Sequence, residues 1–168
     1  MAKVQKTNAM RELDKNKVEY NVYTYESEDG KIDGLAVANK LGQDPKTVFK
    51  TLVAKGHSRE LYVFVIPVGE ELDLKKCAKA VGEKNVEMIH VKDINKYTGY
   101  IRGGCSPLAM KKEYKTVIDI SAERLEKIIF SGGKIGLQIE ANPKEVAKVV
   151  NAEFAELSWY SAWHNIEN

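Results

Sequence analysis

The chain has 168 residues, of which 43% are hydrophobic and 30% charged, and its formal net charge is +2. This composition fits one globular domain over residues 1–168, and it excludes a disordered chain or two ordinary domains. So small a net charge argues against an obligate DNA-binding protein, although it permits contact with RNA.

Cysteine, histidine and glycine spacing excludes several kinds of active site. Cys77 and Cys105 are too far apart for a redox or zinc motif, and the three histidines show no ligand spacing. No nucleophile elbow, phosphate-binding loop or dinucleotide fingerprint is present. We therefore expect no metal and no cofactor. Because the sequence also lacks a signal core and any apolar run of membrane-spanning length, we expect a cytoplasmic protein without membrane contact.

The first elements alternate between helix and strand. Residues 3–16 have the spacing of an amphipathic helix, and residues 18–25 have that of a strand. Asp33 then caps a predicted short helix that ends at Gly42.

Residues 47–54 predict a central strand covered on both faces. β-Branched and aromatic residues dominate this segment, and alternation places Lys50 between Val48 and Leu52 on one largely apolar face. Lysine is seldom buried without a partner, and burial lowers its pKa. From these residues alone, Lys50 either lines a ligand pocket or extends its ammonium group to the edge of the sheet.

The following segment, residues 61–68, predicts a second buried strand that forms a hairpin with the first. A helix is predicted from Asp73 to Gly82, with Leu74 and Cys77 on its core face. A short strand at 86–89 and a helical turn at 91–96 follow.

Residues 98–108 contain three glycines and a proline, which allow backbone to approach a ligand closely or simply form a tight turn. Beyond them we predict strands at 115–120, 126–131, 136–141 and 154–159. A short helix at 121–125 and a helix capped by Asn142 complete the pattern. These elements indicate a single α+β domain with a mixed sheet.

Five motifs in this order resemble the YbaK/EbsC family of aminoacyl-tRNA deacylases, which are relatives of the editing domain of bacterial prolyl-tRNA synthetases. The likeness covers residues 5–158, and no single motif is decisive. The motifs are Tyr23-Thr24-Tyr25, Val48-Phe49-Lys50-Thr51-Leu52, Leu72-Asp73-Leu74-Lys75-Lys76, the segment from Thr98-Gly99-Tyr100 to Gly103-Gly104-Cys105-Ser106-Pro107-Leu108, and Ser131-Gly132-Gly133-Lys134.

The resemblance implies a curved, barrel-like mixed sheet flanked by helices, with a pocket beside the central strand. It also implies a trans-acting enzyme that clears cysteine from Cys-tRNA(Pro), with Cys-tRNA(Cys) as a further candidate substrate. The family's essential lysine matches Lys50, and its backbone-contributing glycine matches Gly103. The expected substrate-binding positions are Tyr25, Phe49, Thr51, Gly104, Cys105, Ser131 and Gly132.

Two departures affect selectivity more than chemistry. Gram-negative-type members of the family carry an aliphatic residue at the position of Cys105 and glycine at that of Ala109. We expect Cys105 to shape selectivity rather than to react.

The sequence offers no conventional protein nucleophile, and in the YbaK type the substrate's own thiol is thought to attack its ester. Lys50 would then hold a phosphate or the ester oxygen, or act as a base if neutral, while Gly103 and Gly104 face the oxyanion. The expected partners are the aminoacylated end of tRNA and a prolyl-tRNA synthetase. Two alternatives stay open: a deacylase for alanine or serine, and a non-catalytic module that binds the aminoacyl end.

Overall fold

The chain is described here by a computed structural model that covers residues 5–159. Its helices are α1 (Asn8–Lys15), α2 (Gly34–Lys40), α3 (Leu74–Val81), α4 (Ile94–Thr98) and α5 (Pro143–Val150), with 3-10 turns η1 (Pro45–Thr47), η2 (Val91–Asp93) and η3 (Ile120–Arg124). Its strands are β1 (Tyr20–Thr24), β2 (Phe49–Gly56), β3 (Leu61–Pro67), β4 (Val86–Met88), β5 (Lys115–Asp119), β6 (Ile128–Ser131), β7 (Leu137–Ala141) and β8 (Glu153–Ala155).

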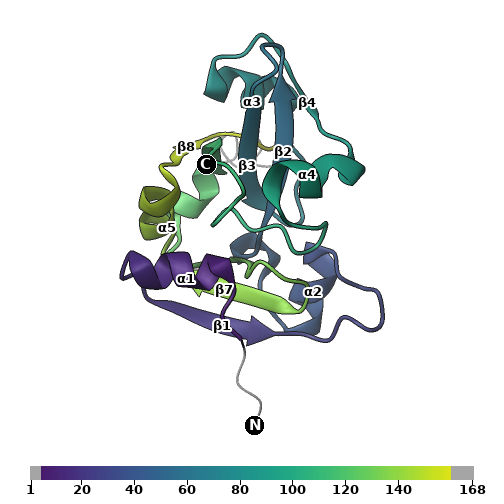
Figure 1. Ribbon diagram of the computed structural model, residues 1–168, viewed down its shortest axis with the longest axis vertical. Coiled ribbons are helices and arrows are strands. Elements are labelled where there is room, and N and C mark those ends of the chain that lie inside the picture. The colour runs from purple at the N-terminus through teal and green to yellow at the C-terminus, as the bar shows by residue number, and fades with distance from the viewer. Residues whose placement is uncertain (1–4, 160–168) are drawn as a thin grey trace.

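The strands divide between two sheets. One has the order β4-β2-β3-β5-β8 and the other the order β1-β7-β6, with α1 lying across β1 and β7 (Figure 1). Within the larger sheet β2 and β3 form the predicted antiparallel hairpin, in which Lys50 lies opposite Ile66. Strands β3, β5 and β8 run parallel, so the sheet is mixed. The α+β class and the hairpin are therefore confirmed.

A parallel bridge between Val48 and Ile129 joins the two sheets where β2 and β6 run side by side. In residues 5–159 each sheet keeps its two edge strands, so the predicted barrel-like closure is not confirmed.

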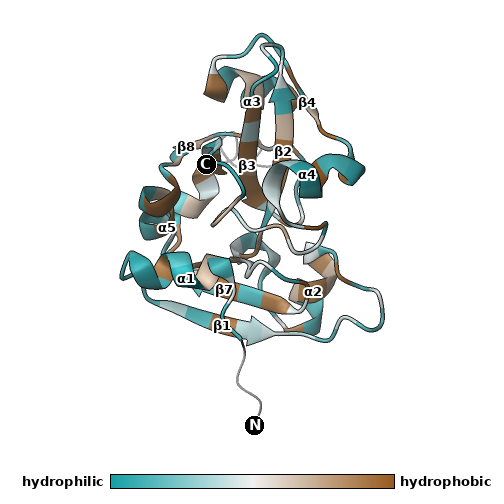
Figure 2. Ribbon diagram, in the orientation of Figure 1, coloured by the Kyte–Doolittle hydropathy of each residue, from teal (hydrophilic) through white to brown (hydrophobic). Residues whose placement is uncertain are grey.

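Apolar side chains cover both faces of β2, as the sequence predicted. Phe49 and Val53 pack into the largest core cluster, together with Leu13 of α1. Ala54, on the opposite face, packs into a second cluster with Cys77 of α3. Strand β3 beside it is hydrophobic along most of its length, in keeping with its central place (Figure 2).

Side-chain caps set the helix boundaries. Asp73 accepts hydrogen bonds from the first turn of α3, and Gly82 ends that helix with a φ of 72°. Leu74 is 39% exposed, so its predicted place on the core face is wrong. Its side chain instead lines an open groove between α3 and β4.

Two predicted elements are shorter than expected. The first helix begins at Asn8, and the predicted residues 3 and 4 lie outside the described range. The last strand covers Glu153–Ala155 rather than 154–159. No helix within residues 5–159 has both the length and the hydropathy needed to cross a membrane.

Candidate functional site

Lys50 is half-buried on the face of β2 that also carries Leu52 and Ala54. Within residues 5–159 its ammonium group forms no hydrogen bond or ion pair. Burial lowers the pKa of Lys50, because an ammonium loses hydration there, and the carboxylates of Glu71, Glu70 and Asp33 oppose this effect in that order. The structure thus gives Lys50 acidic neighbours without a direct partner.

Glu70 and Glu71 lie in the turn that follows β3, and the last described residues of the chain hold that turn in place. The hydroxyl of Ser158 donates to the carboxylate of Glu70, and the N–H of Trp159 donates to the carbonyl of Glu71 over 3.4 Å. Burial raises the pKa of Glu70, while the Ser158 hydrogen bond lowers it. No pattern in the sequence pointed to these two residues, because nothing local links them to Lys50.

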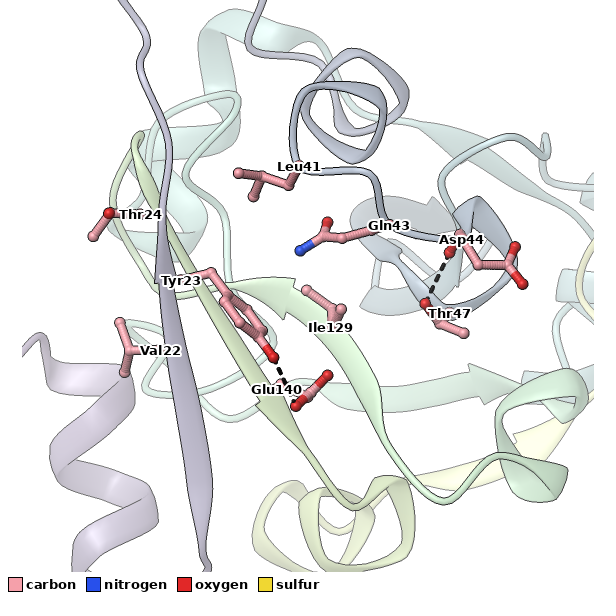
Figure 3. Close-up of a pocket in the computed structure, with 9 residues that line it drawn as sticks. All are labelled: Val22, Tyr23, Thr24, Leu41, Gln43, Asp44, Thr47, Ile129 and Glu140. Carbon is pink, nitrogen blue, oxygen red and sulfur yellow. Dashed lines mark hydrogen bonds between the residues drawn. The ribbon is translucent and has the colours of Figure 1, made fainter.

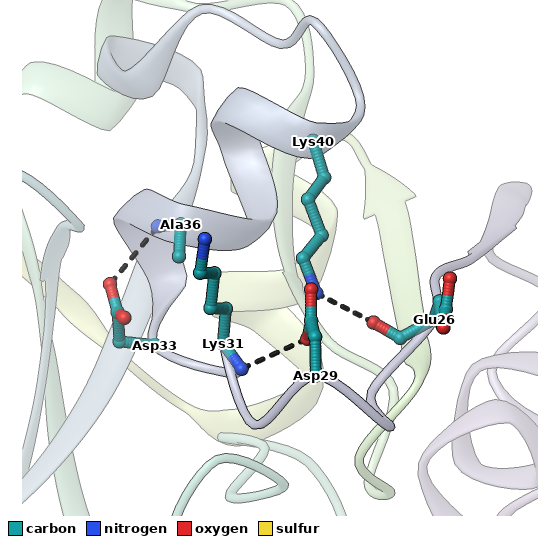
Figure 4. A network of polar contacts seen from close by, with 6 residues as sticks. All are labelled: Glu26, Asp29, Lys31, Asp33, Ala36 and Lys40. Carbon is teal, nitrogen blue, oxygen red and sulfur yellow. Dashed lines mark hydrogen bonds and ion pairs between the residues drawn. The ribbon is translucent and has the colours of Figure 1, made fainter.

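Asp33, the third acidic neighbour, precedes α2 and caps it by accepting a hydrogen bond from the N–H of Ala36 (Figure 4). The segment before it is also fixed. The Lys40 ammonium group lies 2.7 Å from both the Asp29 carboxylate and the carbonyl of Glu26. The Asp33 carboxylate is therefore held by the geometry of the helix start rather than by an ion pair with Lys50.

Ser131 follows the bridge that joins the two sheets. Val48 pairs with Ile129 in an isolated parallel bridge, and Lys50 and Ser131 each follow two residues later along their own strand. The Ser131 hydroxyl accepts a hydrogen bond from the N–H of Gly133 over 3.2 Å, which shapes the loop after β6. Lys50 and Ser131 thus both follow the junction of the two sheets, and a contact of both residues with one substrate stays a prediction.

Both backbone polar groups of Gly132 are hydrogen-bonded within the fold. Its N–H donates to the carbonyl of Leu137 over 3.0 Å, and its carbonyl accepts from the hydroxyl of Thr7 over 2.6 Å. These backbone groups are therefore committed to holding the loop against the start of α1, which leaves a substrate little to bond to at this residue.

Gly103 and Gly104 allow the close packing of their loop. Gly103 has a φ of 85°, and a Cβ atom there would lie 3.0 Å from Cδ1 of Ile32. A Cβ atom on Gly104 would lie 3.1 Å from the backbone nitrogen of Ile135. The Gly104 N–H donates to the carbonyl of Ile101 over 3.0 Å, whereas the Gly103 N–H has no partner within residues 5–159. Gly103 is thus the glycine of this pair whose N–H is free for a ligand.

Three other predicted site residues, Tyr25, Phe49 and Thr51, lie in different environments. The N–H of half-buried Tyr25 donates to the carbonyl of Gly136, which ties the residue to the loop after β6. Phe49 is 2% exposed and lies in the main core, on the face of β2 opposite Lys50. Thr51 shares that opposite face, and its buried hydroxyl has no hydrogen-bond partner in the described chain. The side chains of Phe49 and Thr51 are therefore not grouped with Lys50.

Cys105 is half-buried, and burial raises the pKa of its thiol to about 11, with Thr98 opposing the shift through a hydrogen bond. The side chain is thus a neutral thiol near pH 7 and a poor nucleophile. Ala109, at the second departure, adopts a φ of 54°, the left-handed region that favours glycine.

A hollow of about 600 Å³ is bordered by β1, the end of α2, η1, and Ile129 and Glu140 of the same sheet as β1 (Figure 3). Tyr23 and Glu140 meet there through a hydrogen bond of 3.1 Å. Lys50 does not line this hollow. Within the described chain, no group of three or more His, Cys, Asp or Glu side chains is arranged to hold a metal ion.

The sequence of this chain matches a known family and a known protein. Residues 34–150 match the model of the aminoacyl-tRNA editing domain. A protein of Enterococcus faecalis named "Putative Cys-tRNA(Pro)/Cys-tRNA(Cys) deacylase EbsC" is 46% identical over 154 residues, which are 92% of this chain and 94% of that protein.

Two solved structures share the fold at 20% sequence identity. The hypothetical protein APE2540 has a TM-score of 0.82, with 90% of this chain and 99% of that chain covered. A structure titled as a putative trans-editing enzyme for prolyl tRNA synthetase has a TM-score of 0.77, with 90% and 94% covered. The resemblance that the five motifs indicated is confirmed, and this chain belongs to the aminoacyl-tRNA editing domain family, the family of aminoacyl-tRNA deacylases.

Proposed function

We propose that this chain is a trans-acting editing enzyme that releases cysteine from Cys-tRNA(Pro), with Cys-tRNA(Cys) as a further substrate. The observation that carries the proposal is the 46% identity to the EbsC protein over 92% of the chain. The half-buried Lys50, which lacks a direct partner in the described chain, supports it, because an anionic ligand would supply the missing contact.

In the proposed reaction the substrate provides the nucleophile. The cysteine thiol loses its proton, its sulfur bonds to the ester carbonyl carbon, and the bond from that carbon to the ribose oxygen breaks. The 3′ oxygen of the tRNA takes up a proton as it leaves. Water then opens the resulting thiolactone and releases cysteine. The protein therefore needs no nucleophile of its own, in keeping with a neutral Cys105 thiol.

The residues of the chain position and stabilise the reacting groups. The Lys50 ammonium holds the terminal phosphate or the ester oxygen, and the N–H of Gly103, which has no partner in the described part of the chain, faces the developing oxyanion. Binding of a phosphate next to Glu70, Glu71 and Asp33 places an anion among carboxylates, so the ammonium has to offset that repulsion. Tyr25 and Ser131 remain proposed substrate contacts, whereas the N–H of Gly104 and the backbone of Gly132 are already bonded. Thr51 is also proposed, although its side chain lies on the face of β2 opposite Lys50.

The tRNA partner follows from the family, and the synthetase partner is a separate proposal. A small domain with a net charge of +2 makes few phosphate contacts of its own. We infer that a prolyl-tRNA synthetase delivers the mischarged tRNA and supplies most of the selectivity between tRNAs.

A panel of mischarged tRNAs tests the proposal. Cysteinyl-, alanyl- and seryl-tRNA(Pro) and Cys-tRNA(Cys) would be incubated with the chain, and the release of free tRNA measured under single-turnover conditions. Cysteinyl esters should be cleaved much faster than the others, because alanine has no nucleophilic side chain and a serine hydroxyl is a weaker nucleophile than a thiol.

Each other outcome has a definite meaning. Equal rates on alanyl and cysteinyl esters would rule out assistance by the substrate thiol as the main route. Binding of the charged tRNA without release would identify a non-catalytic module and overturn the proposed function.

A further inference from the structure

A groove rich in lysine lies between α3 and β4, away from the candidate site. It has a volume of about 290 Å³, and its lining includes Lys75 and Lys79 of α3 and Lys84 of the following turn. All three lysines are exposed. Leu74, Ala78 and Val86 form its apolar part. We call this feature the basic groove.

The one carboxylate that lines the basic groove is already bonded elsewhere. Glu83 accepts hydrogen bonds from the backbone N–H and hydroxyl of Ser58 and from the hydroxyl of Tyr62. These bonds lower the pKa of Glu83, so it stays ionised, but its oxygens face other donors. The groove thus has three lysine ammonium groups and one carboxylate, which is already hydrogen-bonded. This excess of positive charge favours the binding of a polyanion.

The basic groove opens on the same side of the sheet as Lys50. Alternation puts Lys50 on one face of β2 with Leu52 and Ala54, and Ala54 packs in one cluster with the groove residues Ala78 and Val86.

Strand register gives the separation. Val86, at one end of the groove, pairs with Gly56, six residues along β2 from Lys50, so this end lies about 20 Å from Lys50 at the rise of a strand. A few nucleotides of single-stranded RNA can span that length.

We propose that the basic groove binds the backbone phosphates of the tRNA acceptor end, a few nucleotides before the terminal residue held at Lys50. The inference rests on the proposed function, which places the 3′ end of the tRNA at Lys50. The lysines act as point charges on phosphates, so the contact adds affinity without reading the base sequence.

The test compares two triple variants with equal changes in charge. Lys75→Gln, Lys79→Gln and Lys84→Gln together remove the cations of the groove. The matched control combines Lys15→Gln, Lys144→Gln and Lys148→Gln, which are exposed lysines of α1 and α5. Glutamine keeps the helix propensity of lysine, so both variants should fold, and thermal unfolding checks this.

Two measurements are made on wild type and both variants. The first is the dissociation constant for uncharged tRNA at several salt concentrations, by fluorescence anisotropy. The groove variant should bind at least tenfold more weakly, and the slope of log affinity against log salt should fall by about 2, from about 0.7 for each phosphate contact. The second is the cleavage of 3′-cysteinyl adenosine, which has no upstream phosphates and should react equally with all three proteins.

The outcomes separate this inference from the proposed function. Equal tRNA affinities and salt slopes for the two variants would contradict the proposal that the basic groove binds tRNA. Failure of the wild-type chain to bind tRNA at low salt would contradict it as well. Loss of tRNA affinity in the groove variant alone would support the groove, even if no charged tRNA were cleaved. In that last case the proposed function, and not the groove, would have failed.

Discussion

The two faces of β2 show how one strand serves both the core and the candidate site. Phe49, Thr51 and Val53 point into the main core beneath α1, whereas Lys50, Leu52 and Ala54 point towards α2 and α3. Adjacent residues on the strand therefore differ in role. A rigid, doubly covered strand holds a half-buried ammonium in a fixed place, which a surface loop could not do as well.

Replacing Phe49 on the core face should have the largest effect of any single substitution on this strand. Phe49→Ala should lower the free energy of unfolding by about 3–5 kcal/mol, because the side chain is 2% exposed and leaves a cavity. Chemical denaturation measures the loss. Leu52→Ala on the other face is the control and should cost less, since Leu52 is only half-buried. Equal losses would mean that the two faces do not differ in packing.

Replacing Lys50 should reduce the activity and not the ability to fold, unlike the replacement of Phe49. Lys50→Ala should reduce single-turnover deacylation of Cys-tRNA(Pro) by on the order of 10²–10³-fold, as expected for losing one stabilising charge, and leave the fold intact. Lys55→Ala removes another lysine of the same strand and should keep near-normal activity. Near-normal activity in Lys50→Ala itself would remove Lys50 from the mechanism.

Thr51 lies on the core face of β2 and is also a proposed substrate contact, so its replacement tests both roles of the strand. Its buried hydroxyl has no hydrogen-bond partner among the residues that the structure describes, so Thr51→Val should raise the free energy of unfolding by about 1 kcal/mol. Thr116→Val is the control: the Thr116 hydroxyl donates to the carbonyl of Tyr114 over 3.0 Å, and its loss should destabilise the protein.

The activity of Thr51→Val sharpens the comparison. If the missing partner of the hydroxyl is the substrate, the KM for Cys-tRNA should rise in the more stable variant. An unchanged KM together with higher stability would make Thr51 a core residue without a role in binding.

The sequence predicted what depends on neighbouring residues and missed what depends on distant ones. Alternation predicted both faces of β2, and Asp73 and Gly82 predicted the ends of α3, because strand pleating and helix caps are local. The Val48–Ile129 bridge joins segments some eighty residues apart, so no local pattern could show that two sheets meet beside Lys50.

The candidate site shows the same limit. The resemblance supplied Lys50 and Gly103, but the acidic neighbours Glu70, Glu71 and Asp33 come from separate segments that only the fold brings together. Hydrogen bonding was equally hidden from the sequence. Among residues 5–159 it gives the N–H of Gly104 a partner and that of Gly103 none, although the two glycines look alike in the sequence.

The smallest effect that we predict is a pH-dependent change in stability. The pKa of Lys50 is 10.5 in an unfolded chain and lower in the fold, chiefly because of burial. At pH values below both, the fold bears the cost of holding an ammonium in a half-buried place. As the pH rises through the folded pKa towards 10.5, the folded lysine becomes neutral and the cost disappears. Lys50→Met should therefore be more stable than wild type near pH 7, and the gain should shrink as the pH rises.

Thermal unfolding of Lys50→Met between pH 7 and about 10 measures this gain, with Lys55→Met as the control for losing a lysine from the same strand. A stability gain at pH 7 would mean that burial outweighs the three carboxylates, so that the fold carries an ammonium whose stabilising partner is an incoming anion. A loss at pH 7 would mean the reverse. Glu70, Glu71 and Asp33 would then hold Lys50 as part of a structural cluster, and a phosphate would have to displace that attraction before it could bind.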